Sequence, residues 1–249
     1  MIDYIDHLVT AKSERDEIAR GKFSGRVHFT KFGHNTTCGT GYETVWHGSS
    51  LYTYLTGAEQ LKISSVGASA DDDTAASGIG ARTLHIHGLN SSYNTATETI
   101  DLNGSVVVTT VASYIRVCCA EVTSAGSTGY NLGAIHVRNN ADDTDLAICI
   151  IQEAASHACI YTIPSGKTGY ITSWRISESS NKGADISVWI RNYNEQVWRY
   201  KKGIYTLDNI FETNYSIPIA ISEKSDIEVR SKAIQDGARI SSTIEGWYE

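Results

Sequence analysis

The chain has 249 residues, of which 41% are hydrophobic and 20% are charged, so its composition supports a packed core and excludes general disorder. Its formal net charge of −7 at pH 7 disfavours a general role in nucleic-acid binding. We expect no signal peptide and no membrane-spanning segment, because no apolar run is long enough for either.

Charge divides the chain into regions. Residues 35–154 carry only four basic side chains against twelve acidic ones, whereas residues 155–249 carry eleven of each. This contrast predicts that the acidic middle and the neutral end form separate units. The five cysteines fit no disulfide framework or zinc ribbon, so we expect reduced and buried thiols at Cys38, Cys118, Cys119, Cys149 and Cys159.

The first twenty residues differ from the rest. Apolar side chains recur there at helical spacing, and charged residues fill the other positions. The pattern predicts a short amphipathic helix that ends near Gly21, within an N-terminal arm of residues 1–25. Such an arm packs either on its own domain or on a neighbouring subunit, and in the second case its contact residues are Ile5, Leu8 and Val9.

From Arg26 onward the sequence predicts β-strands, since Val27–Phe32 alternates apolar and polar residues. Asn103-Gly104 is the strongest two-residue hairpin signal in the chain. Further strands of the first series are expected at Leu61–Val66, Ala81–Gly88, Thr97–Leu102, Ser105–Val111, Ser113–Val122 and Ala134–Val137.

A second series of strands begins near Ala158. Its clearest member alternates Ile186, Val188 and Ile190 with polar-phase residues. The others are expected at Cys159–Ile163, Gly169–Arg175, Gln196–Tyr200, Tyr215–Ala220, Asp226–Lys232 and Ala238–Tyr248. The regular spacing predicts an all-β protein of two antiparallel sandwich or jelly-roll-like units, residues 26–145 and 146–249, divided near the acidic segment Asn139–Asp145.

One candidate metal site is the pair His85 and His87, which share a face if Leu84–His87 is a strand. Zinc needs a third or fourth ligand, and the adjoining strand offers one carboxylate, Asp101, among threonines. An exposed polar strand face explains the same pattern, and we therefore predict no metal and no cofactor. The remaining histidines are scattered through the sequence at His7, His28, His34, His47, His136 and His157.

No other pattern indicates catalysis. Two acidic segments, Asp71–Asp73 and Asp142–Asp145, lack the ligand rhythm of a calcium loop, so we interpret them as solvated loops. No nucleophile elbow, dinucleotide loop or phosphate loop is recognisable. The sequence therefore predicts that the chain is not an enzyme, and the alternative is a metal-dependent hydrolase that uses His85 and His87.

Aromatic residues form the remaining candidate site. Trp174 and Trp247 are expected in the core between sheets, whereas Trp189 falls on the polar phase of its strand. An outward tryptophan is able to stack on a sugar or on another subunit. The candidate interaction residues of this region are Trp189, Tyr193 and Trp198.

Several segments carry a resemblance to a known family. They are VHFTKFGHNTTCGTGYETVW at 27–46, the glycine-rich stretch at 69–104, IYTIPSGKTGYITSW at 160–174, EKSDIEV at 223–229 and the closing EGWYE. In this order, over about residues 20–249, they resemble virion structural proteins of tailed phages that infect marine bacteria and cyanobacteria.

The resemblance implies a structural component of the virion, folded in the host cytoplasm, without enzymatic activity. We expect a capsid decoration protein that forms a homo-oligomer, such as a trimer, and docks on the major capsid protein. The alternative is a tail-associated or carbohydrate-binding virion protein that contacts tail proteins. We expect neither nucleic acid nor membrane as a partner.

Overall fold

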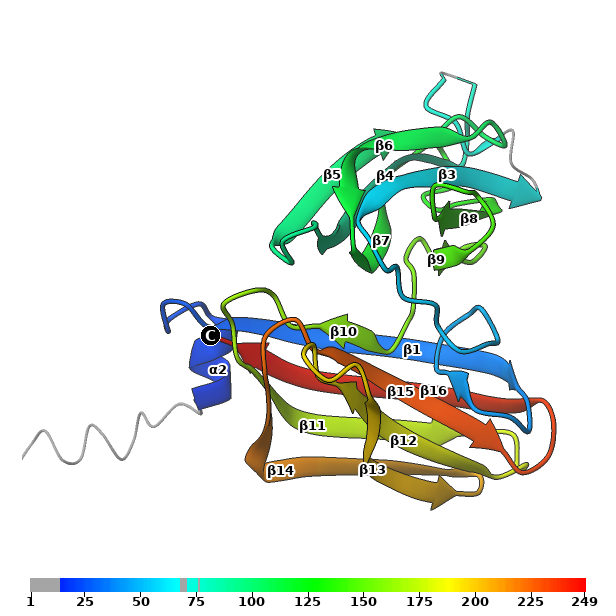
Figure 1. Cartoon of the computed structure of the whole chain (residues 1–249). Coiled ribbons are helices and arrows are strands. Elements are labelled where there is room, and N and C mark those ends of the chain that lie inside the picture. The colour runs from blue at the N-terminus through cyan, green and yellow to red at the C-terminus, as the bar shows by residue number, and fades with distance from the viewer. Residues whose placement is uncertain (1–13, 68–70, 76) are drawn as a thin grey trace, which may run out of the picture.

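The computed structural model describes residues 14–67, 71–75 and 77–249, and in it the chain forms two β bodies stacked one above the other (Figure 1). The predicted contact residues Ile5, Leu8 and Val9 lie outside the described residues. Within the described part of the chain, no helix has the length and apolar character needed to cross a membrane.

The short helix α2, Glu14–Ala19, ends where the sequence predicts. Gly21 adopts a left-handed conformation with φ of 68°, and its N–H donates to the carbonyl of Ile18 at 2.9 Å. This arrangement satisfies the last carbonyls of the helix. Ile18 is buried against the lower body, beside which α2 lies in Figure 1.

The lower body is a two-sheet sandwich, which we call the main sandwich. Its first sheet has the order β1-β16-β11-β14, formed by Val27–Cys38, Ala238–Tyr248, Gly169–Glu178 and Asn209–Ile221. Its second sheet has the order β10-β15-β12-β13, formed by Ile160–Thr162, Asp226–Ala233, Ala184–Arg191 and Trp198–Thr206. The two-residue strand β2, Glu43–Thr44, pairs with β15.

The upper body, which we call the inserted unit, is made only of residues that lie between β2 and β10 in the chain. One sheet has the order β6-β3-β8-β9, formed by Val108–Tyr114, Glu59–Gly67, Gly133–Arg138 and Asp145–Cys149. The other has the order β5-β4-β7, formed by Thr95–Asp101, Ala81–Leu89 and Arg116–Ala125. A first linker, residues 45–58, enters this unit and a second linker, residues 150–159, leaves it (Figure 1).

All of these strand pairs are antiparallel, which confirms the predicted all-β class. The pairing differs from the predicted division at residue 145 in two ways. Strand β1 pairs with β16 along its length, so the first strand lies in the main sandwich. Strand β9 lies past the predicted boundary but pairs with β8 of the inserted unit.

The acidic segment that suggested the boundary is a hairpin turn between β8 and β9. The side-chain oxygen of Asn139 accepts the N–H groups of Asp143 and Thr144 at 3.0 and 3.1 Å. A turn rich in Asn and Asp folds in this way because their short side chains replace backbone partners. The composition of the segment reports a turn rather than a domain boundary.

The Asn103-Gly104 prediction is correct as a turn and wrong as a hairpin. It joins β5 to β6, which belong to different sheets. The Gly104 carbonyl accepts the N–H of Ser65, and the Gly104 N–H donates to the Asp72 carbonyl, both at 2.9 Å. The backbone groups of Gly104 are therefore hydrogen-bonded to Ser65 and Asp72, and the chain passes from one sheet of the inserted unit to the other.

Alternate side chains of the strands are buried between the two sheets of the main sandwich and form its core. The predicted period of two in β12 is confirmed, since Ile186, Val188 and Ile190 are buried in the core while Trp189 and Arg191 point outward. The buried cluster of the main sandwich also includes Cys118 of β7. The apolar core therefore continues into the inserted unit.

Candidate functional site

Aromatic and basic side chains alternate on the outward face of the sheet that contains β12, β13 and β15. The guanidinium of Arg230 lies 4.9 Å from the Trp189 ring and 4.5 Å from the Trp198 ring. Arg191 continues the row, 4.9 Å from Trp198 and 4.7 Å from Tyr54. We call this set of stacked side chains the aromatic row.

The structure brings the predicted residues Trp189 and Trp198 into one row and leaves Tyr193 at its far end. Tyr193 is 41% exposed and packs edge-on against Tyr93 of the inserted unit, with ring centroids 5.4 Å apart. The Trp189 indole N–H donates to Ser187 at 2.8 Å. Cation–π contacts and this hydrogen bond fix the tryptophans within the protein itself.

Two buried carboxylates lie beneath the row. Asp226 accepts hydrogen bonds from Arg116 at 2.8 and 3.1 Å and from Arg191 at 2.6 and 3.0 Å. Glu228 pairs with Arg230 at 3.0 and 3.1 Å. Burial raises the pKa of the Glu228 carboxyl above its usual value, although the hydrogen bonds from Arg230 oppose that shift.

An open groove of about 460 Å³ lies between the two bodies next to this row. It is lined by residues of both bodies, among them Tyr54, Tyr93, Tyr193, Arg116, Arg191 and Gln196. Cations also lie over the tyrosine rings of this groove, with Arg116 5.4 Å from Tyr93 and Lys224 5.3 Å from Tyr193. The groove therefore presents aromatic rings and basic groups together.

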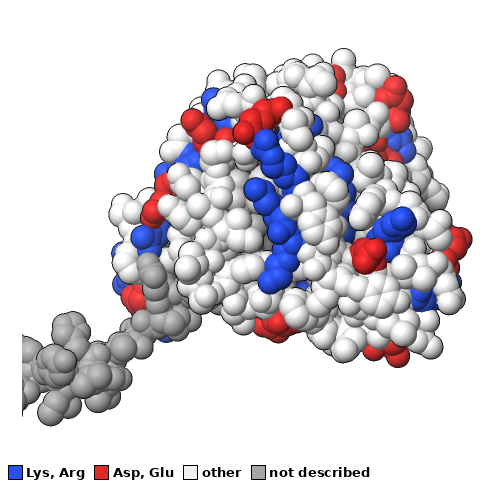
Figure 2. All heavy atoms as spheres, turned by 60° about the horizontal axis from the view of Figure 1, so that its bottom comes forward, with Lys and Arg blue, Asp and Glu red and all other residues white. Residues whose placement is uncertain are grey.

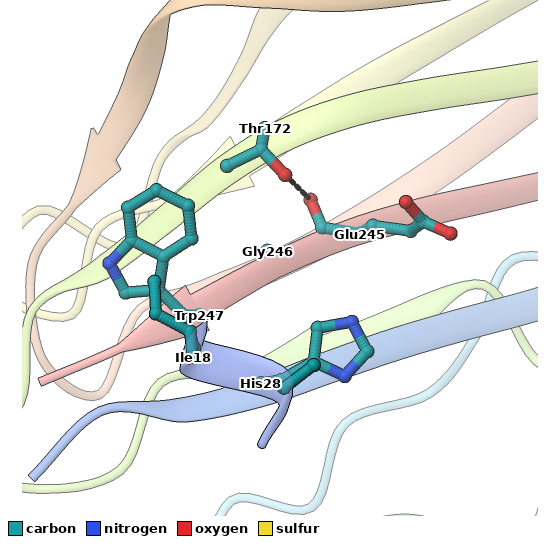
Figure 3. A pocket seen from close by; sticks show the side chains of 7 residues that line it. Ile18, His28, Thr172, Glu245, Gly246 and Trp247 are labelled. Atoms are coloured by element: carbon teal, nitrogen blue, oxygen red, sulfur yellow. Dashed lines mark hydrogen bonds between the residues drawn. The ribbon is translucent and has the colours of Figure 1, made fainter. Parts of the chain in front are cut away.

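A second cavity, of about 190 Å³, lies between α2 and the sheet of β1, β16 and β11 (Figure 3). Trp247 and Ile18 lie on one side of it, and His28 lies on the other. Trp247 is half-buried on the outer face of β16, so its expected position between the sheets is wrong. Trp174 is buried between the sheets as expected, and its indole N–H donates to Ser242 at 2.9 Å.

The strand pairing of His85 and His87 follows the prediction. His85 lies opposite Thr99 and His87 opposite Thr97, with His85 Nδ1 at 2.9 Å from the Thr99 hydroxyl. Burial, and next the nearby Lys31 ammonium, lower the pKa of His87. The positive charge of Lys31 opposes the binding of a metal cation at these two histidines.

Three other histidines, separate in the sequence, come together where the two bodies meet. Nε2 of His34, His47 and His157 lies 3.4, 3.7 and 3.3 Å from Oε2 of Glu153. Among the described residues, the ligand atoms of His34, His47 and Glu153 form a group within 4.8 Å of one another. Burial, and then the nearby His34, lower the pKa of His47 to about 4, so this imidazole is neutral at neutral pH.

The acidic segment Asp71–Asp73 is not simply solvated. Asp72 is fully buried, and its carboxylate accepts the N–H groups of Ala81, Leu132 and Gly133 at 2.7–2.9 Å together with the Ser65 hydroxyl at 2.6 Å. A buried carboxylate with four donors organises the loops around it. Asp143, in contrast, is exposed as expected.

The sequence did not indicate the histidine cluster, because its members lie far apart in the chain, with His34 and Glu153 separated by 119 positions. No local spacing rule detects such a group. The cysteines do follow the prediction, since all five are free and Cys119 alone is not fully buried. Burial raises the pKa of Cys118 to about 11, as expected for thiols that pack as small apolar side chains.

No protein-family model matches the sequence, and no curated protein matches it. Among solved structures, the chain is similar to the VP2 subviral particle of infectious bursal disease virus, with 13% identity over 90% of this chain and 71% of that chain and a TM-score of 0.20. It is also similar to the structure of the Gx strain of this virus, with 10% identity over 90% and 76% of the two chains and a TM-score of 0.20. Likeness at this level carries no argument about function.

Proposed function

We propose that this chain is a virion structural protein of a tailed phage. In this proposal it is a capsid decoration protein that associates with copies of itself and docks on the major capsid protein. The ordered family-like segments of the sequence support the virion assignment. The proposed self-association is supported by one observation, a pair of open sheet edges on one side of the main sandwich.

Both sheets of the main sandwich end on that side. Within the described residues, β13 pairs only with β12, and β14 pairs only with β11. A short turn at residues 207–208 joins the two edge strands. Large apolar side chains are exposed along them, at Tyr200, Tyr205, Leu207, Ile210 and Ile217.

Figure 2 brings forward the bottom of Figure 1, where β13 and β14 lie. Lys and Arg side chains form a band across the middle of this face, with uncharged surface on both sides. Unpaired backbone groups beside exposed apolar side chains form a template for another chain, and natural proteins cover or blunt such edges. The basic band and Pro218 of β14 protect part of these edges, and a neighbouring subunit that covers the exposed apolar side chains protects the rest.

Two measurements test the proposal. Cryo-electron microscopy of intact virions is expected to show this chain on the capsid lattice, whereas density at the tail contradicts the decoration role. Sedimentation velocity of the purified full chain is expected to show a concentration-dependent oligomer. A monomer at every concentration contradicts association through the open edges.

A second function is favoured by the groove between the bodies. There Tyr93 and Tyr193 lie beside Arg191 and Gln196, so side chains able to hydrogen-bond to a sugar line one groove. This supports a tail-associated protein that binds carbohydrate. Glycan-array binding that is lost in Tyr193→Ala supports this alternative, and an array without hits excludes it.

A further inference from the structure

The histidine cluster forms where both linkers cross β1. A Cβ atom at Gly33 would lie 2.2 Å from the Val45 carbonyl oxygen and 2.3 Å from the Cys159 nitrogen, so glycine alone permits this approach. The Cys159 N–H donates to the Val45 carbonyl at 3.0 Å, which places the two linkers side by side. His34 follows Gly33, and the linkers supply His47 and His157 close to that crossing.

The distances from Glu153 to the three histidines are those expected around a single metal ion. Four ligands arranged tetrahedrally at about 2.0 Å from zinc are about 3.3 Å from one another. Oε2 of Glu153 lies 3.4 Å from Nε2 of His34, 3.7 Å from Nε2 of His47 and 3.3 Å from Nε2 of His157. Nε2 of His34 also contacts Nε2 of His47, so these two rings must rotate apart to admit an ion between them.

The hydrogen-bond partner of His47 Nδ1 determines the tautomer of this histidine. Nδ1 lies 3.4 Å from the backbone carbonyl oxygen of Ile148. A carbonyl oxygen only accepts hydrogen bonds, so Nδ1 carries the proton and Nε2 presents its lone pair to the cluster. Metal-binding histidines commonly have such a carbonyl partner on the nitrogen that does not bind the metal.

The loop that carries Glu153 is held in place before any ion binds. Gln152 and Ala154, on either side of Glu153, are both left-handed, with φ of 69° and 55°. Their N–H groups donate to the backbone and side-chain oxygens of the buried Asn131, each at 3.0 Å. Strained residues of this kind persist where the surrounding structure holds them.

We propose that His34, His47 and Glu153 bind one Zn²⁺ ion, and that His157, which contacts Glu153, lies next to this site. Imidazole nitrogens favour zinc over magnesium or calcium, which prefer oxygen ligands. The ion connects β1 of the main sandwich to both linkers of the inserted unit. It therefore acts as a structural clamp between the two bodies.

The test uses the full chain, purified without a histidine tag and stripped of metal with EDTA. Titration with ZnCl₂ by calorimetry is expected to show one equivalent bound, and Co²⁺ is expected to give the absorption bands of a tetrahedral site. Zinc is also expected to raise the temperature of unfolding. His34→Gln and Glu153→Gln are each expected to weaken zinc binding by about 10-fold or more.

His85→Gln and His136→Gln are the matched controls, because these histidines lie outside the cluster, and they are expected to bind zinc as the unaltered chain does. His34 and Glu153 are both partly exposed, so their variants are expected to remain folded, which circular dichroism checks. A folded chain that binds no zinc overturns the proposal. Zinc binding that is unchanged in both His34→Gln and Glu153→Gln overturns it equally.

Discussion

Gly33 shows how one residue positions a whole unit. Its missing side chain allows the backbone of both linkers to lie directly on β1, with the Val45 carbonyl and the Cys159 N–H as the closest atoms. Neither atom is at the end of a flexible side chain, so neither moves without a shift of backbone. This gives a physical role to the absence of a side chain at Gly33.

Gly33→Ala is expected to lower the free energy of unfolding by about 3 kcal/mol, because the added methyl overlaps backbone atoms of both linkers. Urea denaturation measures the change. Gly57→Ala is the control, since a Cβ there meets nothing within 4 Å, and its effect is expected to stay within about 0.5 kcal/mol. Equal losses in the two variants contradict the argument.

Glu178 ties two turns together at one end of the main sandwich. Its carboxylate accepts the Ser180 N–H at 2.8 Å, the Asp208 N–H at 2.6 Å and the Ser180 hydroxyl. Burial by itself raises the pKa of this carboxyl, but these hydrogen bonds outweigh burial and hold the pKa below its ordinary value of 4.5. The charged form is therefore stabilised by folding.

Because the folded pKa is lowered, Glu178 contributes stability that is complete above its unfolded pKa and is lost as the pH falls through the folded value. Glu178→Gln is expected to cost about 2 kcal/mol at neutral pH. The difference from the unaltered chain is expected to shrink as urea denaturation is repeated from about pH 7 to about pH 3. Glu212→Gln, at an exposed carboxylate, provides the control, and a pH-independent difference at Glu178 contradicts the assignment.

At the scale of the element, β14 explains how the main sandwich presents an apolar edge. Its pairing with β11 is regular up to Asn214 and resumes at Ile219, and the bulge between them contains Pro218. A bulge redirects side chains, and proline is tolerated on an edge strand because its outer backbone groups are not paired. Ile217 is consequently 83% exposed.

Ile217→Lys is expected to weaken self-association by about 10-fold or more, because it removes apolar area from the proposed interface and adds a charge. Sedimentation velocity at several concentrations measures the effect. Val111→Lys on β6 of the inserted unit is the matched control, since Val111 is also highly exposed, at 87%. Self-association of this variant is expected to be unchanged. If Val111→Lys alone weakens association, the interface lies on the inserted unit instead.

At the scale of the whole molecule, a buried ion pair joins the two bodies. Arg116 of β7 in the inserted unit donates to Asp226 of β15 in the main sandwich at 2.8 and 3.1 Å, and both residues are buried. Arg116 also donates to the carbonyl of Leu55 in the first linker at 2.9 Å. One guanidinium thus connects the inserted unit, the first linker and the main sandwich.

Arg116→Met is expected to lower the free energy of unfolding by about 3–5 kcal/mol, since it leaves part of the Asp226 charge unpaired in the interior. Differential scanning calorimetry is expected to show that Arg116→Met unfolds at a lower temperature than the unaltered chain. Arg175→Met breaks an exposed pair with Glu212 and is expected to cost less than about 1 kcal/mol. A similar cost for both variants shows that the junction depends on apolar contacts instead.

The strands were largely determined by the sequence alone, because alternating burial is a local pattern with a period of two. The predicted bounds of Ala184–Arg191 and Ala238–Tyr248 agree with β12 and β16, and the end of α2 near Gly21 was readable from its glycine. Strand β9 was missed, since its short run Asp145–Cys149 follows a turn that resembles a linker. The Trp189 and Trp198 positions were recognised, but the arginines that cover them were not.

Tertiary structure alone decided which strands belong together and which side chains meet. The pairing of β1 with β16 joins segments near opposite ends of the chain, and no composition or periodicity specifies such a long-range register. The junction of Arg116 with Asp226 and the meeting of His34, His47 and Glu153 arise for the same reason. Local sequence determines which face of a strand is buried, whereas the partners across that face depend on how the chain returns through space.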